Sequence, residues 1–166
     1  MWTSEHKVCI RNVGLCGHYT LPAGALRISG RYHVAIDVDP SASAVPALYT
    51  SLTGEVATWE KLRQILRDDE AATTALRNIA RSRLAVELSD ALDCTDAAVL
   101  GLASDHLCGD DRTVTQAIGV AAVALGVEAI LARSATSLGN NLIIFTSQLR
   151  PGSAITLLET IRPQLP

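Results

Sequence analysis

The sequence predicts a single α+β domain, and three observations lead to this prediction. The chain has 166 residues, a length at which one hydrophobic core serves one domain. Apolar residues make up 48 % of it, which is enough for such a core. Strand-like and helix-like segments are mixed along the chain without regular alternation, and this favours an α+β domain over a doubly wound parallel sheet.

The first half of the chain contains three expected strands and one expected helix. Alternating or β-branched runs predict strands over residues 6–13, 32–38 and 47–52. The small, polar segment 39–46 contains two prolines and is typical of a loop. From Gly54 on, apolar residues including Trp59 recur at spacings of three and four. This spacing predicts an amphipathic helix that runs to about Asp69 and buries the apolar stripe.

The second half begins with an expected strand over 83–88 and a short helix over 95–103, with Thr95 as its N-cap. A longer helix is predicted from Thr113 to Leu125, because Thr113 and Gln116 have capping-box spacing and Gly126 follows as a stop. Its apolar run predicts a largely buried helix. Strands over 127–132 and 142–146 follow, with a turn-rich loop over 134–141 between them.

Composition and charge exclude several classes of function. The formal charge is −3, the pI is about 5.7 and no run of Lys or Arg occurs, so we expect neither a nucleic-acid binder nor a protein of anionic membrane surfaces. The sequence shows no secretory signal and no apolar stretch of about 18 residues, which predicts a cytoplasmic protein. The cysteines and histidines lack metal-ligand spacing, so we expect reduced thiols and no metal site.

Four polar residues are candidates for a site, although each has an ordinary alternative. Arg31 follows a glycine and could bind a phosphate, or it could be an exposed arginine at a strand start. Tyr49 could stack on a ligand ring or belong to the core. Glu60 could be a functional carboxylate or a salt-bridged residue on a helix flank, and Ser134 could be a functional hydroxyl or a loop cap. No phosphate-loop, nucleophile-elbow or metalloprotease motif occurs in the sequence.

Taken in order, these stretches resemble the RES domain, a toxin-like family named for its Arg, Glu and Ser residues. "GALRISGRYH", "ALYTSLTGEVATWEKL", "VELSDALDCTD" and "TQAIGVAAVALGVEAILARSATSLGNNLIIF" are similar to successive segments of that family. The resemblance covers residues 7–147. It implies a mixed β core with flanking helices similar to ADP-ribosyltransferases, and an activity directed at NAD.

Carried onto matching positions, the resemblance implies pocket residues Arg31, Tyr49, Glu60 and Ser134. A further arginine of the family falls on Arg11 or on Arg27. The implied function is a toxin that cleaves the nicotinamide–ribose bond of NAD, as a glycohydrolase or as a phosphorylase with phosphate as acceptor. A protein antitoxin would block the cleft. The alternatives are an ADP-ribosyltransferase that modifies a cellular protein, and an inactive nucleotide-binding module.

The proposed chemistry needs these residue types. Breaking the nicotinamide–ribose bond develops positive charge on the ribose, which a nearby carboxylate such as Glu60 stabilises. Arg31, with Arg11 or Arg27, suits the pyrophosphate, because a guanidinium makes paired hydrogen bonds to phosphate. Tyr49 suits the cationic nicotinamide ring. Ser134 would hydrogen-bond the carboxylate or a ribose hydroxyl. ADP-ribosyltransferases that modify proteins often carry a second carboxylate two residues before the catalytic one. Thr58 occupies that position here, so we expect NAD breakdown rather than transfer to a protein. Glu55 lies close enough in the sequence to keep the transfer reaction open as an alternative.

Overall fold

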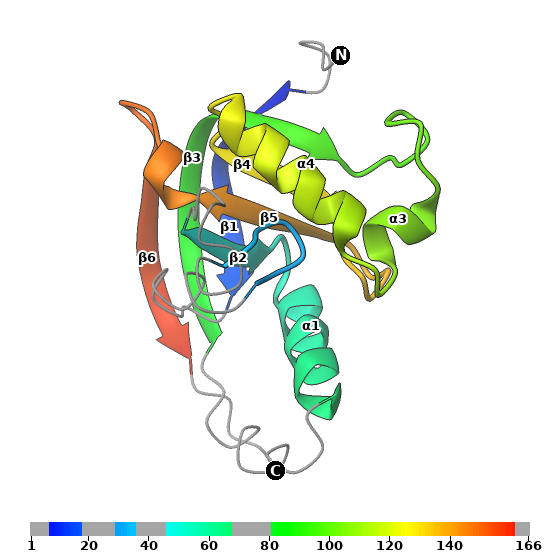
Figure 1. The fold of residues 1–166 in the computed structure, drawn as a ribbon. Coiled ribbons are helices and arrows are strands. Elements are labelled where there is room, and N and C mark those ends of the chain that lie inside the picture. Colours follow the sequence, from blue (N-terminus) through cyan, green and yellow to red (C-terminus); the bar gives the residue numbers. More distant parts are fainter. Residues whose placement is uncertain (1–6, 18–28, 36–45, 68–80, 162–166) are drawn as a thin grey trace.

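The computed structural model of the chain describes residues 7–17, 29–35, 46–67 and 81–161. Its elements are β1 (Lys7–Gly17), β2 (Ala47–Ser51), α1 (Gly54–Arg67), β3 (Arg81–Cys94), α3 (Ser104–Cys108), α4 (Thr113–Ala124), β4 (Ala129–Arg133), β5 (Asn140–Phe145), the 3-10 helix η3 (Thr146–Gln148) and β6 (Ala154–Ile161). Figure 1 shows α4 lying across the curled sheet, with α3 near one end of α4.

The sheet curls because its strands pair in a ring. β2, β5, β4 and β3 are neighbours in this order, and β1 pairs with both β2 and β3. β4 runs parallel to the end of β3, whereas β6 runs antiparallel along the beginning of β3. The other recorded pairs are antiparallel. The expected α+β class, with a mixed β core and flanking helices, is confirmed.

The two faces of the sheet bury two different apolar clusters, because successive side chains of a strand point to opposite faces. One cluster includes Leu48, Val86, Leu142 and Ile144. The other lies on the face that α3 and α4 cover, and it includes Ile118, Ile130, Ile143 and Phe145 together with Tyr49. Tyr49 and the odd-numbered positions of β5 therefore share the helix-covered face.

The strand expected over 32–38 is wrong for residues 32–35, which form no strand. Here the backbone is held by single hydrogen bonds instead of a ladder. The Tyr32 N–H donates to the Tyr49 hydroxyl over 2.8 Å, the Ala35 N–H donates to Ser29 Oγ over 2.9 Å, and the Gly30 N–H donates to the His33 carbonyl over 3.1 Å. Residues 36–38 lie outside the described part of the chain.

The helix expected over 95–103 is also wrong. Asp93 Oδ1 accepts hydrogen bonds from the Thr95 N–H and hydroxyl, so Thr95 does not cap a helix. One turn forms at residues 97–100, and Gly101 ends it with φ at +69°, a conformation that glycine adopts without strain. The helical residues of this region are instead those of α3.

Helix α4 confirms the expected element but corrects its details. Arg112 is the N-cap, and the Thr113 hydroxyl donates to Asp111 rather than forming a capping box with Gln116. Gly126 follows the helix with φ at +67°, as a C-terminal glycine should. The helix is buried on one face only, since the Val120 side chain is 55 % exposed.

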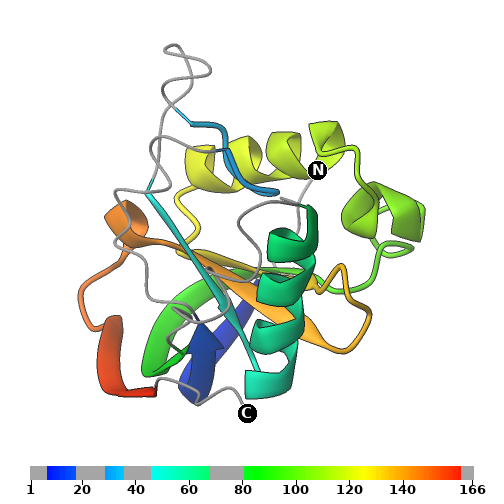
Figure 2. The same ribbon diagram turned by 90° about the horizontal axis from the view of Figure 1, so that it is seen from below.

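Helix α1 confirms the expected element but only part of its expected buried stripe. Val56 and Ala57 are buried, whereas the Trp59 side chain, expected on the buried stripe, is 49 % exposed. Glu60 is partly buried instead. Figure 2, seen from below, shows α1 beside the strands, with α4 and α3 beyond it.

Candidate active site

Glu60 projects from the second turn of α1 to the loop that follows β4. Its Oε1 accepts three hydrogen bonds, from Ser134 Oγ at 2.6 Å, from the Ala135 N–H at 3.1 Å and from Asn141 Nδ2 at 2.9 Å. All three donors are neutral, and no basic side chain in the described part of the chain forms an ion pair with Glu60. Among the described residues, neutral donors alone therefore hold the carboxylate, and they contact only its Oε1.

Ser134 is fully buried at the end of β4. Because its single hydroxyl proton is donated to Glu60, Ser134 Oγ must accept from the Thr136 hydroxyl at 2.6 Å and from the Thr136 N–H at 3.1 Å. The Ser134 carbonyl also accepts from the Ser137 N–H at 3.0 Å. Ser134 thus caps the loop and contacts Glu60 at the same time.

A second layer of polar residues lies behind Glu60 on β5 and β2. Asn141 at the beginning of β5 donates to Glu60, and its Oδ1 accepts from Ser51 Oγ at 2.6 Å. Ser51 and Asn141 are directly opposite each other in the β2–β5 ladder. Tyr49 lies two residues before Ser51 on the same strand face, roughly 7 Å away along the strand. The ladder therefore places Tyr49 on the face of the sheet that also holds Glu60.

Tyr49 is partly buried, and its hydroxyl fixes the segment 29–35. It accepts from the Tyr32 N–H at 2.8 Å and lies 3.0 Å from His33 Nδ1, and the rings of Tyr49 and His33 are 5.5 Å apart. Burial raises the pKa of Tyr49, against the hydrogen bond from Tyr32 and the positive charges of Arg112 and Arg31. The hydroxyl therefore stays protonated at neutral pH, with two arginines close enough to influence it.

Arg31 is partly buried and does not contact Glu60. Its Nη1 donates to the carbonyls of Leu107, at 3.2 Å, and Gly109, at 2.6 Å. These two carbonyls lie at the end of α3. Among the described residues the guanidinium uses Nη1 alone, and its other N–H groups make no hydrogen bond there.

The loop between α3 and α4 connects the Arg31 side of the site to the Glu60 side. Gly109 accepts from Arg31, and Asp110 forms an ion pair of 3.5 Å with Arg63 of α1. Arg63 also donates to the Ala135 carbonyl at 3.1 Å, next to the Ala135 N–H that donates to Glu60. One continuous set of contacts therefore links the two sides.

The two other predicted arginines are not placed at this site. Arg11 belongs to β1, between Ile10 and Val13, where the pairing with β3 shifts register. Its side chain lies outside the described part of the structure, and so does the whole of Arg27.

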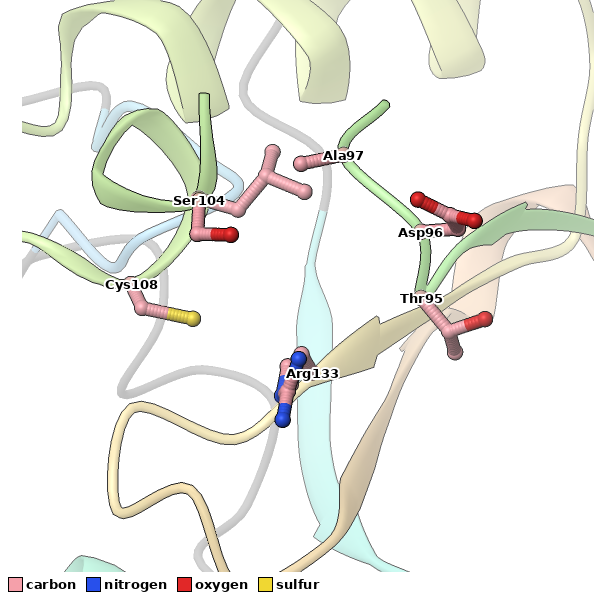
Figure 3. Close-up of a pocket in the computed structure, with 7 residues that line it drawn as sticks. Thr95, Asp96, Ala97, Ser104, Cys108 and Arg133 are labelled. Carbon is pink, nitrogen blue, oxygen red and sulfur yellow. The ribbon is translucent and has the colours of Figure 1, made fainter. Parts of the chain in front are cut away.

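A cavity of about 320 Å³ lies between the turn after β3, helix α3 and the end of β4 (Figure 3). It is lined by Thr95, Asp96, Ala97, Ser104, Leu107, Cys108 and Arg133. Cys108 Sγ lies 3.9 Å from the Ser134 carbonyl, and Arg133 directly precedes Ser134. Glu60, Tyr49 and Arg31 do not line this cavity, so it is separate from the candidate site.

The model of the RES domain matches residues 16–163 of this chain. The chain belongs to the RES domain family. Among solved structures, this RES chain is similar to one from the Mycobacterium tuberculosis MbcT–MbcA toxin–antitoxin complex, with 23 % sequence identity, a TM-score of 0.69, and coverage of 92 % of this chain and 86 % of that one. The search of curated proteins found no match. No helix in the described part of this RES chain is long and apolar enough to span a membrane.

Sequence reasoning missed two contributors to the site of this RES chain. Asn141 lies in the turn-rich segment 134–141, where nothing in the sequence separates it from Asn140. The structure does so by placing Asn141 opposite Ser51 in the β2–β5 ladder. Arg112 precedes α4, where its Nη1 lies 3.4 Å from the Ser29 carbonyl and its charge acts on Tyr49. Neither belongs to a motif, because each depends on contacts between distant parts of the chain.

Proposed function

We propose that this chain binds NAD and breaks the bond between nicotinamide and ribose, with Glu60 as the catalytic carboxylate. The observation that carries the proposal is the binding of Oε1 by three neutral donors, which fixes the carboxylate without neutralising it. A fixed negative charge stabilises the positive charge that develops on ribose as nicotinamide leaves. The family resemblance supplies NAD as the substrate class.

The remaining residues have roles in binding NAD. Arg31 and Arg112 bring positive charge to the neighbourhood of Tyr49, where a pyrophosphate could bind to the free N–H groups of Arg31. Tyr49 is only partly buried, so its ring can contact the nicotinamide ring through stacking and cation–π attraction. Arg11 and Arg27 remain candidates for the second phosphate-binding arginine.

Transfer of ADP-ribose to a protein is the second candidate, and the surroundings of Glu60 favour it less. The hydroxyl of Thr58, two residues before Glu60, donates to the Gly54 carbonyl of its own helix over 2.8 Å. Glu55 is exposed on α1 and lies roughly 140° around the helix from Glu60. No second carboxylate in the described chain is thus placed beside Glu60 on α1 to activate a protein side chain, and water or phosphate is the proposed acceptor.

We further propose that the protein is a toxin whose activity a protein antitoxin blocks. One similar solved structure is that of a toxin–antitoxin complex. Two large apolar side chains are exposed on the segments that hold Glu60: Trp59 on α1, 49 % exposed, and Leu138 in the loop after β4, 53 % exposed. Apolar side chains exposed around a charged site suit a protein partner that covers it.

The proposed reaction is tested by incubating the purified protein with NAD, with and without phosphate, and by identifying the products. We expect nicotinamide together with ADP-ribose when water is the acceptor, or with phosphorylated ADP-ribose when phosphate is the acceptor. Induced expression without a partner should also lower cellular NAD and slow growth. Absence of nicotinamide release in both buffers would contradict the proposal.

A further inference from the structure

We propose that Asn141, held by Ser51, is a positioning residue that fixes the direction in which the second oxygen of the Glu60 carboxylate points. The proposal rests on the proposed function, because it assigns a task within that reaction. Its basis is the uninterrupted series of hydrogen bonds from β2 through β5 to α1: Ser51 Oγ to Asn141 Oδ1 at 2.6 Å, and Asn141 Nδ2 to Glu60 Oε1 at 2.9 Å.

The direction of each hydrogen bond follows from the chemistry of the groups. Glu60 as a carboxylate can only accept, so the amide must present its NH₂ to Glu60 and its oxygen to Ser51. Ser51 is 4 % exposed, and its hydroxyl is the recorded donor to that oxygen. The carboxylate therefore fixes the orientation of the Asn141 amide, and the Ser51 hydroxyl stabilises that orientation by donating to the amide oxygen.

Asn141 connects Glu60 to the paired strands of the sheet, whereas the other two donors belong to a loop. Ser134 and the Ala135 N–H belong to the loop after β4, whereas Asn141 is the residue opposite Ser51 within a five-residue ladder. A side chain based on paired strands is positioned more rigidly than one on a loop. With Oε1 bound to both the loop and the sheet, rotation of the carboxylate is prevented and Oε2 keeps a constant direction.

The test compares Asn141→Asp with the wild-type protein by measuring kcat and KM for nicotinamide release from pH 5 to pH 8. The substitution retains the shape of the side chain but places a second carboxylate against Glu60. We expect kcat to fall about ten- to a hundredfold at pH 7, with KM little changed. The ratio of variant to wild-type kcat should rise toward pH 5, because the two adjacent carboxylates then share a proton and the substituted side chain can donate to Glu60 again.

The other charged groups near Glu60 do not produce this pH dependence. On α1 these groups are Lys61 and Arg63, and on the loop before α4 Asp110 pairs with Arg63. The loop after β4 contributes Ser134, Ala135 and Thr136, none of which titrates in this range. These groups are the same in both proteins, so they cancel in the ratio.

Two variants of β2 serve as a matched pair. Ser51→Ala removes the hydroxyl that supports the Asn141 amide oxygen and should lower kcat by roughly two- to tenfold. Thr50→Val removes a similar buried hydrogen bond, from Thr50 Oγ1 to the Leu142 carbonyl at 2.8 Å, on the opposite face of the same strand pair. Thr50→Val should leave kcat unchanged at every pH, while it lowers the free energy of unfolding by about as much as Ser51→Ala does.

The outcomes separate this proposal from the proposed function. If the wild-type protein releases no nicotinamide, the proposed function fails, and the positioning role fails with it. If the wild-type protein is active and Asn141→Asp either retains full kcat or loses activity by the same factor at every pH, Asn141 is a structural residue only and the positioning proposal is overturned. A loss of kcat that diminishes toward pH 5 supports it.

Discussion

At the scale of single residues, the central feature is a carboxylate bound by neutral donors. The ordinary interpretation of Glu60 from sequence was a salt bridge on a helix flank, with Arg63 or Lys61 nearby. In the structure Arg63 instead contacts the Ala135 carbonyl and Asp110. A carboxylate fixed by neutral donors, with no ion pair among the described residues, keeps a negative charge at a defined place, which suits a functional role.

Ser134→Ala should lower kcat for nicotinamide release about ten- to a hundredfold. The substitution removes one of three donors to Glu60 Oε1, at 2.6 Å, while Asn141 and the Ala135 N–H remain. The loss should therefore be smaller than that of Glu60→Gln. The measurement is steady-state nicotinamide release, with Ser137→Ala in the same loop as the control. Wild-type kcat in Ser134→Ala would show that this hydrogen bond has no part in the reaction.

At the scale of elements, the sequence predicted the helices and strands whose apolar residues recur with a regular period. Helix α1, helix α4 and strands β2, β4 and β5 were expected within a few residues of their observed bounds. The failures at 32–35 and 95–103 have a common cause. In both segments, single polar contacts such as Tyr32 N–H to the Tyr49 hydroxyl and Thr95 to Asp93 replace regular backbone pairing. Contacts between distant residues leave no periodicity in the sequence.

The site was partly predictable for the same reason. Glu60 and Ser134 lie 74 residues apart in the sequence, and only the order of the family's motifs related them before their hydrogen bond was known. Asn141 and Arg112 could not be predicted, because their positions depend on the register of β2 against β5 and on the packing of α4 against the segment 29–35. Strand β6 and helix α3 were not expected; β6 finds its partner far away in sequence, and α3 has five residues, too few for a helical period.

Gly119→Ala should destabilise the protein, although alanine favours an isolated helix by about 1 kcal/mol. Gly119 lies in α4, where an added Cβ would collide with the backbone carbonyl oxygen of Tyr32. Backbone cannot move aside cheaply, so we expect a loss of about 1–3 kcal/mol in the free energy of unfolding. Because the same contact positions Arg31, KM for NAD should also rise.

Urea denaturation and the KM for NAD check this prediction, with Val120→Ala on the exposed face of α4 as the control. That substitution should change stability by less than about 0.5 kcal/mol. Equal or greater stability of Gly119→Ala would mean that α4 does not approach the segment 29–35 so closely.

At the scale of the whole molecule, Glu128 joins three parts of the fold and makes stability depend on pH. It is fully buried before β4 and accepts hydrogen bonds from the N–H groups of Ser89, at 2.7 Å, Asp90, at 2.9 Å, and Arg150, at 2.7 Å. Burial raises its pKa, but these hydrogen bonds and one from the Ser153 side chain outweigh burial and lower the pKa overall. A lowered pKa in the folded state means that stabilisation is complete above the unfolded pKa of about 4.3 and is lost as pH falls through the folded value.

Glu128→Gln should therefore destabilise the protein at pH 7 by about 1–3 kcal/mol, because the amide has one accepting oxygen where the carboxylate has two. The difference from wild type should shrink as pH falls below about 4. Urea unfolding at several pH values measures it. Glu159→Gln, which breaks an exposed 2.7 Å ion pair with Arg83, is the control and should cost less than about 1 kcal/mol. A Glu128→Gln difference independent of pH would exclude this role of the carboxylate.

The measurement that tests the central claim most directly is nicotinamide release from NAD by wild-type protein and by Glu60→Gln, with NAD binding of both followed by calorimetry. Glutamine retains the size of the side chain but removes its charge. The account predicts that the variant binds NAD about as well as wild type while its release of nicotinamide falls by at least about a hundredfold. Release by Glu60→Gln at the wild-type rate would contradict it, because the reaction would then not depend on the carboxylate that the site holds in place.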